Sequence, residues 1–369
     1  MDRRTFLKSV GVSTAATLAI APRLTRLGSA DAAENAAGWR TFEVTTRVEV
    51  LNPSGVARVW LPAPMITETD YHKPLGDKWN GNASTAKLYR DEKYDGAMLH
   101  AEWRASEKSP VVELVSRFST RDRAVDLSKP GPAGAAKESQ ASLAKYLEPT
   151  KFIPLDGLVL ETSQNITAAA GARSDMQKAR ALYEWIVENT FRDPKTPGCG
   201  LGDIKTMLET RYFGGKCADL NALFVGLARA AGVPARDLYG VRVADSKEFK
   251  SLGKSGEITK AQHCRAEFYD ADYGWVPVDP ADVRKVLLEE KPGLTLEDPI
   301  AKRARAKLFG QWEMNYLGFN HAHDVKLPNS SGAPLAFLMY PQGETGDGRK
   351  DSLDPGNFKY RIISREITA

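Results

Sequence analysis

The stretch GGKCADLNALFVGLARAAGVPAR, residues 214–236, decides how the rest of this chain is interpreted. Apolar residues recur along it with helical spacing and share one face: Cys217, Leu220, Phe224, Leu227 and Ala231. Gly232 stands where a left-handed cap is needed, and Pro234 prevents the helix from continuing. The pattern therefore predicts a helix over residues 217–231, with Cys217 in its first turn.

The position of Cys217 has chemical consequences. The free amides and the dipole at a helix N-terminus stabilise an anion, which lowers the pKa of a thiol placed there. The thiolate is the nucleophilic form of cysteine, and the backbone N–H of Cys217 is a candidate donor to an oxyanion. Gly214 and Gly215 let another chain or a substrate approach closely. The alternative is a small apolar residue buried at the start of a helix, as free cysteines often are.

A nucleophile needs a base, and the chain has five histidines. His263 begins the strand-like stretch HCRAEFYD, in which alternate residues share a face. One face carries Cys264, Ala266 and Phe268 and is expected to be the core side. The other carries His263, Arg265, Glu267 and Tyr269, which point towards a cleft or a partner element.

The next strand supplies a carboxylate. A tight turn over residues 270–274 leads into WVPVDP. If Tyr269 pairs with Trp275, Arg265 lies opposite Asp279, and His263 becomes the diagonal neighbour of Asp279 on the same face. A carboxylate there would hold the imidazole in one tautomer, so a triad of Cys217, His263 and Asp279 is geometrically feasible.

The two stretches 214–243 and 263–280 together resemble the transglutaminase-like superfamily, and the resemblance covers roughly residues 150–285. It implies an α+β core of the papain-like kind, in which a cysteine-bearing helix packs on an antiparallel sheet. It also implies that Cys217 is the nucleophile, His263 the base and Asp279 the orienting group. Arg265 stands where this family often has an aromatic residue, and Phe191 where a tyrosine is common; both departures concern the substrate cleft and thus the specificity. No cofactor is implied, and we find no acidic cluster for metal-dependent activation.

The chain divides into five segments. Residues 1–32 are expected to be a signal peptide, 39–126 a mostly β accessory domain of the sandwich kind, and 127–149 a linker rich in Pro, Gly and Ala. Residues 150–285 form the core, and 286–369 are expected to be an extension packed on it. Within the β domain, residues 39–64 read as a hairpin, and further strands are expected at 85–90, 97–105 and 111–119.

Further elements follow from local patterns. Residues 174–191 carry an apolar helical face, with Ser174 or Asp175 as the N-cap, and Asp203 is expected to cap a short helix over 204–208. Strands are expected in LYGVRV, GWVPVD, LAFLMYP and KYRIIS. The large aromatic residues Trp275, Trp312 and Tyr316 are expected in the core.

The N-terminus carries Arg3-Arg4, a modestly apolar run and small residues near Ala32. These are features of a twin-arginine export signal, so we expect the export machinery as a partner and a periplasmic or otherwise exported destination. The alternative is an amphipathic helix. Removing residues 1–32 takes the formal net charge from +4 to about +1, which gives no case for nucleic acid or an anionic membrane surface. The mature chain is not expected to be an integral membrane protein.

Other reactive side chains leave alternatives open. The chain has three cysteines, and a bridge between Cys199 and Cys264 would leave Cys217 free. The run from His321 to Asp324 could ligate a metal, although a polar strand edge explains it as well.

The function predicted from these residues is cysteine acyl transfer on a protein or peptide substrate. The Cys217 thiolate attacks an amide, His263 protonates the leaving nitrogen, and water resolves the thioester. The alternatives are transfer of the acyl group to an amine, which cross-links protein glutamines, and a non-catalytic interaction module of the cell envelope.

Overall fold

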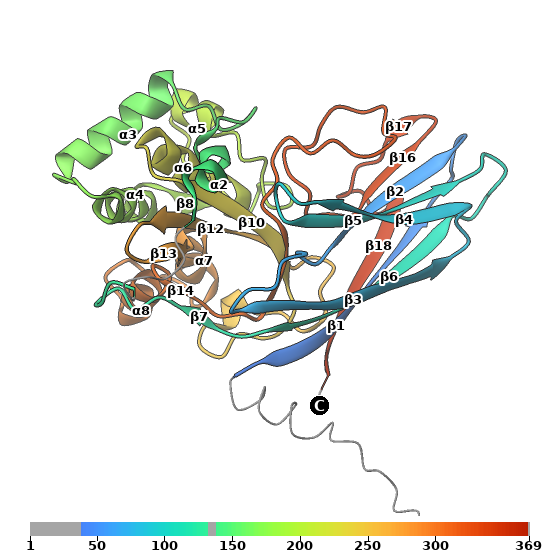
Figure 1. Ribbon diagram of the computed structural model, residues 1–369, viewed down its shortest axis with the longest axis horizontal. Helices are drawn as coiled ribbons and strands as arrows, with labels where there is room; N and C mark the ends of the chain where they lie inside the picture. Colours follow the sequence, from blue (N-terminus) through green and yellow to red (C-terminus); the bar gives the residue numbers. More distant parts are fainter. Residues whose placement is uncertain (1–37, 132–137, 368–369) are drawn as a thin grey trace, which may run out of the picture.

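The structure is a computed structural model that describes residues 38–131 and 138–367. The chain forms two bodies side by side, a helix-covered core and a β-sandwich (Figure 1). The export signal expected over residues 1–32 lies outside the described residues. No helix in the described part of the chain is long and apolar enough to cross a membrane.

The β-sandwich consists of two five-stranded sheets, ordered β11-β18-β1-β6-β3 and β17-β16-β2-β5-β4. Apolar residues from both sheets, among them Val48, Leu61 and Leu99, form one buried cluster between them. The strands are β1 (Arg40–Val50), β2 (Ala57–Ala63), β3 (His72–Gly81), β4 (Thr85–Asp91), β5 (Gly96–Trp103), β6 (Val111–Thr120), β11 (Gly256–Glu257), β16 (Gln342–Thr345), β17 (Gly348–Arg349) and β18 (Phe358–Ile367).

The hairpin expected over residues 39–64 is wrong. β1 pairs with β6 and β18, whereas β2 pairs with β5 and β16 in the opposite sheet. The turn between them carries the chain across the sandwich. The alternation of apolar and polar residues identified the buried face of β1 correctly. The same alternation occurs in a strand that pairs with its sequence neighbour and in a strand that faces this neighbour across a core, so it does not specify the partner.

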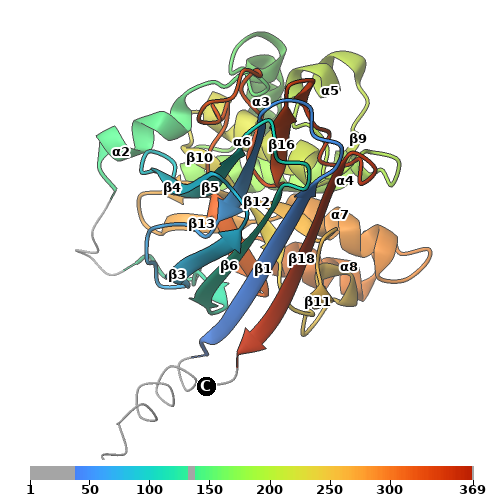
Figure 2. The same ribbon diagram turned by 90° about the vertical axis from the view of Figure 1, so that its right-hand side faces the viewer.

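The C-terminal extension does not pack on the core alone, as residues 286–369 were expected to do. β18 lies between β1 and β11, and Figure 2 shows β1 and β18 running side by side. β16 completes the opposite sheet beside β2. The sandwich therefore needs strands from both ends of the described chain, because residues 39–126 leave β1 and β2 each with an unpaired edge.

The core is a four-stranded antiparallel sheet, ordered β13-β12-β10-β15, covered by helices. Its elements are α3 (Gly157–Ala169), α4 (Asp175–Asn189), β8 (Phe191–Arg192), α5 (Ile204–Thr210), β9 (Gly214–Gly215), α6 (Cys217–Ala230), β10 (Ala235–Arg242), η2 (Lys250–Leu252), β12 (Gln262–Asp270), β13 (Gly274–Val278), α7 (Pro280–Glu289), α8 (Pro299–Lys307) and β15 (Tyr316–Asn320). The helix predicted over 217–231 is confirmed, with Gly232 at φ +81° after it. Ser174 and Asp203 cap α4 and α5 as expected.

The segment expected as a linker, residues 127–149, contains α2 (Gln140–Ala144) and the 3-10 turn η1 (Lys145–Leu147). Tyr146 of this turn is buried, with its ring edge-on to Trp275 at 5.1 Å. Composition predicted an exposed linker, but the described part from residue 138 onwards is held on the core by Tyr146 and by hydrogen bonds of Glu138 and Glu148. The strand expected in LAFLMYP is also absent; only Leu335 makes an isolated bridge, to Val325.

The two bodies share a buried apolar cluster. Phe42, Phe118 and Ile362 of the sandwich pack with Val241 and Phe319 of the core sheet. The short strands β7 (Arg123–Ala124) and β14 (Gln311–Trp312) pair nearby, and the indole N–H of Trp312 donates to the carbonyl of Val278. The core sheet is therefore packed against residues of both bodies.

Candidate active site

Cys217 is the first residue of α6 and is only 4 % exposed. It lines a cleft of about 980 Å³, whose other lining residues include His263 and Tyr340. The backbone N–H of Cys217 donates to no residue within the described part of the chain, because the first amides of a helix have no partner inside it. The cleft therefore contains the thiol of Cys217 and, next to it, a backbone N–H that has no partner among the described residues.

His263 and Asp279 meet as the strand register predicts. Tyr269 pairs with Trp275, which places Asp279 one residue beyond the last pair of β12 and β13. His263 Nε2 lies 2.7 Å from Asp279 Oδ2, and both side chains are buried. Asp279 is also the N-cap of α7, since its Oδ1 accepts from the backbone N–H of Asp282 at 3.0 Å. The carboxylate is therefore fixed by the helix that follows it.

A second carboxylate, which the sequence reasoning missed, also reaches His263. Asp282 Oδ2 lies 3.4 Å from His263 Nε2. Arg242, at the end of β10, donates from Nη2 to both oxygens of Asp282, at 2.6 and 2.8 Å. The signal available in the sequence was their spacing: Asp279 directly precedes Pro280 at the start of a helix, and Asp282 follows three residues later in its first turn.

Two further polar residues hold the histidine and the helix that carries the thiol. Asn221 of α6 donates from Nδ2 to the carbonyl of Cys264 at 2.8 Å and to Asp279 Oδ1 at 3.2 Å. It thus ties the helix to both strands of the candidate triad. Asp219 accepts from the backbone N–H groups of Leu201, Gly202 and Lys216 and fixes the loop beside the thiol.

Arg265 fills the place where the family often has an aromatic residue. Its guanidinium lies over the ring of Tyr316 at 4.4 Å and donates to the carbonyl of Glu313 at 2.9 Å. It also lies 3.9 Å from Asp279. Arg265 therefore supplies positive charge behind the carboxylate and does not line the cleft. Phe191 packs edge-on to Tyr212, while its neighbour Arg192 lines the cleft.

The electrostatics favour a thiolate beside an imidazolium. The neighbouring thiols of Cys199 and Cys264 hold the pKa of Cys217 well below its usual value, and His263 adds to this against the effect of burial. Burial and the charge of Arg242 lower the pKa of His263, but Asp282 and Asp279 outweigh them and raise it to about 9. In this state three anions face three cations: Cys217, Asp279 and Asp282 against His263, Arg242 and Arg265.

The pKa values of the two carboxylates, Asp282 and Asp279, shift in opposite directions. Burial opposes ionisation of Asp282, but the charges of Arg242 and His263 hold its pKa well below the usual value. Burial and the charge of Asp282 raise the pKa of Asp279, which His263 counteracts.

The three cysteines are free thiols, and all are buried. The bridge considered between Cys199 and Cys264 is therefore absent. Cys199 donates to the carbonyl of Gln262 at 3.3 Å, and its own carbonyl accepts from the N–H of Ala218 at 2.9 Å. Burial raises the pKa of Cys264, whose sulfur contacts Met339. Cys199 and Cys264 are thus protonated thiols next to Cys217.

A cation could be ligated by His263, Asp279 and Asp282, whose ligand atoms lie within 4.8 Å of one another. The charges around them argue against it. Arg242 already neutralises Asp282, and Arg265 stands behind Asp279, so a metal ion would sit beside two guanidinium groups.

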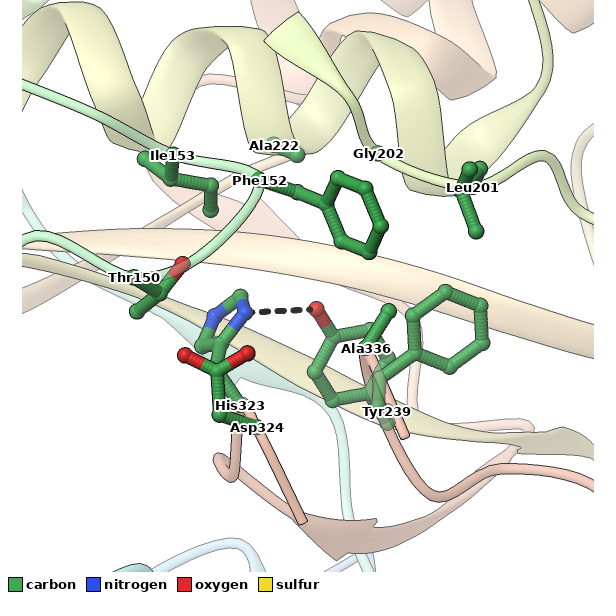
Figure 3. Close-up of a pocket in the computed structure, with 11 residues that line it drawn as sticks. Thr150, Phe152, Ile153, Leu201, Gly202, Ala222, Tyr239, His323, Asp324 and Ala336 are labelled. Atoms are coloured by element: carbon green, nitrogen blue, oxygen red, sulfur yellow. Dashed lines mark hydrogen bonds between the residues drawn. The ribbon is translucent and has the colours of Figure 1, made fainter. Parts of the chain in front are cut away.

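The second histidine cluster is structural. His321 Nδ1 donates to the carbonyl of Asp237 at 2.7 Å, and His323 Nε2 lies 3.1 Å from Asp237 Oδ2. Figure 3 shows the His323 ring aimed at the Tyr239 hydroxyl, at the edge of a cavity of about 10 Å³. That volume holds one water at most. The metal site considered for residues 321–324 is not formed by this arrangement, in which His321 is occupied by the backbone carbonyl of Asp237 and His323 by its carboxylate.

Comparison with known proteins gives the family. Residues 161–280 match the model of the transglutaminase-like superfamily, a range that contains Cys217, His263 and Asp279. An uncharacterized protein of Haemophilus influenzae is 35% identical over 348 residues, which are 88% of this chain and 91% of that protein.

Solved structures resemble the chain more distantly. A protein of Cytophaga hutchinsonii, named as a candidate cysteine protease, is 13% identical over 89% of this chain and 98% of its own, with a TM-score of 0.49. The periplasmic domain of TgpA from Pseudomonas aeruginosa is 15% identical over 76% of this chain and 96% of its own, with a TM-score of 0.34. The family match over the helix and strands that carry the site decides the assignment: this chain belongs to the transglutaminase-like superfamily.

Proposed function

We propose that the protein is a cysteine amidase or peptidase in which Cys217 is the nucleophile, His263 the acid–base group and Asp279 the orienting carboxylate. The observation that carries the proposal is the arrangement at one cleft of a helix-terminal thiol and a histidine held by a buried carboxylate at 2.7 Å. A merely structural cysteine would need neither the partner nor the cleft.

The hydrogen bond between His263 and Asp279 determines which imidazole nitrogen takes part in the reaction. Asp279 holds His263 at Nε2, which leaves Nδ1 for the thiol and the substrate. The Cys217 thiolate attacks the amide carbon, and the carbonyl oxygen takes the negative charge. The imidazolium then gives its proton to the nitrogen as the C–N bond breaks, and a thioester remains. Water attacks the thioester, His263 takes a proton from it, and the carboxylic acid leaves as the thiolate reforms.

Two donors could stabilise the oxyanion. One is the unused backbone N–H of Cys217 at the start of α6. The other is Gln262, which lines the cleft next to His263 and whose buried Nε2 has no partner in the residues described. Gln262→Ala should then lower kcat on an amide by about 100-fold. It should leave the alkylation of Cys217 by iodoacetamide unchanged, because that reaction forms no oxyanion.

The decisive experiment is the rate of Cys217 alkylation by iodoacetamide as a function of pH, followed by mass spectrometry in wild type and His263→Ala. We expect fast labelling of the wild type well below the pKa of a free thiol, about 8.5, and loss of this labelling in the variant. Slow labelling of both proteins, with the pH dependence of an ordinary thiol, would refute the proposal and favour the non-catalytic interaction module.

We also propose that the protein is exported through the twin-arginine route, which the Arg3-Arg4 pair supports. Replacing both arginines with lysine should leave the protein in the cytoplasmic fraction with its N-terminal segment attached. Export of that variant at the wild-type level would contradict this assignment.

A further inference from the structure

The charges that line the cleft at Cys217 are strongly one-sided. Eight lining residues are lysine or arginine, and Glu257 is the single carboxylate among them. The whole chain, by contrast, carries 51 basic and 47 acidic residues. The imbalance is therefore a property of the cleft and not of the overall composition.

Several of these cations are already neutralised. Arg242 pairs with Asp282 at 2.6 Å, and Arg361 pairs with Glu257 at 2.7 Å, which also cancels the one acidic group of the lining. Arg192 and Lys285 pair with Glu289, at 2.5 and 3.6 Å, and Lys359 pairs with Glu49 at 3.2 Å.

Three lysines of the lining are different. Lys216, Lys254 and Lys260 have no carboxylate within ion-pair distance in the described part of the chain. Lys254 and Lys260 are exposed, and Lys216 is half-buried. These three residues are called the cleft lysines below. Their positive charges are therefore not neutralised by an ion pair with any described residue.

The cleft lysines lie around the reacting groups. Lys216 directly precedes Cys217, and Lys260 stands three residues before His263. Lys254 comes from the segment between β10 and β12, and all three reach the same cavity. Apolar side chains such as Leu353 and Phe358 form other parts of its wall. Low-dielectric walls focus the field of charges of one sign into a cleft, so an anionic ligand is concentrated there.

We propose that the cleft selects an acidic acyl donor, a peptide that carries glutamate or aspartate within a few residues of the amide that Cys217 attacks. The inference rests on the proposed function, because it needs Cys217 to act on an amide. It adds the substrate class: the carboxylates of the peptide pair with the cleft lysines, and the apolar wall packs against its remaining side chains.

The first test compares two alkylating reagents at Cys217, the anion iodoacetate and the neutral iodoacetamide. The ratio of their rate constants reports the local potential, and iodoacetamide alone reports the thiolate. We expect the ratio to fall about 10-fold in Lys254→Glu/Lys260→Glu, and less in the Gln double variant, at low ionic strength. Lys108→Glu, in the turn between β5 and β6, is the matched control and should leave both rates unchanged.

The second test uses protection of Cys217 from iodoacetamide. The probe is an acetylated and amidated peptide with one central glutamine flanked by glutamates, compared with the same peptide carrying glutamine at every flanking position. The acidic peptide should protect at a concentration about 10-fold lower, and this advantage should vanish in the glutamate double variant and at high salt.

The outcomes separate the two proposals. An unreactive Cys217 would refute the amidase itself. A reactive thiolate whose reagent ratio does not respond to Lys254→Glu/Lys260→Glu would overturn the acidic-substrate inference alone. Equal protection by the two peptides, or stronger protection by an oligothymidylate than by the acidic peptide, would overturn it as well.

Discussion

At the scale of single residues, the site depends on two carboxylates sharing one imidazole. Asp279 orients His263, and Asp282, held by Arg242, adds a second negative charge 3.4 Å away. Both raise the pKa of His263. The buried His263 imidazolium is stable because the carboxylates of Asp279 and Asp282 and the thiolate of Cys217 are its neighbours. The charge on each of these groups therefore depends on the others.

The raised pKa of His263 predicts a pH dependence of stability in Cys217→Ser, a variant that removes the opposing ionisation of the thiol. Between pH 6.5 and about 9 the folded state holds a proton on His263 that the unfolded state has lost. The free energy of unfolding should therefore fall by up to about 3 kcal/mol as the pH rises through this window. Urea unfolding at several pH values measures it. The slope should be absent in Cys217→Ser/His263→Ala, and a slope common to both variants would contradict the assignment.

Asp282→Asn tests the second carboxylate. The upper inflection of the Cys217 alkylation rate, where His263 loses its proton, should move below the wild-type value of about 9, because one of the two charges that raise this pKa is removed. Alkylation rates across the alkaline range measure the shift. Asp203→Asn is the control: it removes a carboxylate away from His263, keeps an N-cap acceptor for α5, and should not move the inflection. An unmoved inflection in Asp282→Asn would show that Asp279 suffices.

At the scale of elements, the start of α6 is held by the loop that precedes α5. Asp219 accepts three backbone N–H groups, two of them from residues 201 and 202 of this loop. Gly200 comes so close that a Cβ built on it would lie 1.8 Å from Asp219 Oδ2, and its φ is +89°. Glycine is required here both by the backbone conformation and by the space that the carboxylate occupies.

Gly200→Ala should therefore lower the free energy of unfolding by about 2 kcal/mol or more, and the displaced Asp219 should slow the alkylation of Cys217. Gly171→Ala is the matched control. Its φ is +62°, but no atom lies within 4 Å of the new Cβ, so only the backbone strain of about 1 kcal/mol is expected and no change in thiol reactivity. Equal costs for the two variants, measured by urea unfolding, would contradict the contact with Asp219.

At the scale of the whole molecule, the sandwich and the core are joined by a shared apolar cluster and by β18. Ile362 of β18 is 2 % exposed and packs with residues of the core sheet. The cleft itself is lined from both bodies, since Phe358 of β18 and Cys217 of α6 both face it. The two bodies are therefore expected to unfold together.

Ile362→Ala tests this cooperativity. Truncating a buried isoleucine costs about 2–5 kcal/mol. Although the change lies in the sandwich, we expect the urea midpoint of thiol exposure in the core, reported by Cys199 and Cys264, to fall together with the midpoint of circular dichroism. A thiol midpoint that stays at the wild-type value while the circular dichroism transition moves would indicate two independently folding domains.

The sequence by itself determined those parts of the site that depend on residues close to one another along the chain. Helical periodicity and Gly232 set the ends of α6 and placed Cys217 in its first turn. Alternation and the turn at 270–274 set the register of β12 and β13, which brought Asp279 to His263. These features follow from short-range geometry, in which a period or a tight turn allows few arrangements.

Only the tertiary structure decided what distant segments contribute. One partner of β1 is β18, whose paired residues lie more than three hundred positions away in the sequence, and no local pattern distinguishes that pairing from a hairpin with β2. Likewise, Arg242 reaches Asp282 and the cysteines gather around Cys217 because β10, β12 and the 199–202 loop converge on α6. Charge and packing choose among many long-range partners at once, so only the folded chain shows which ones meet.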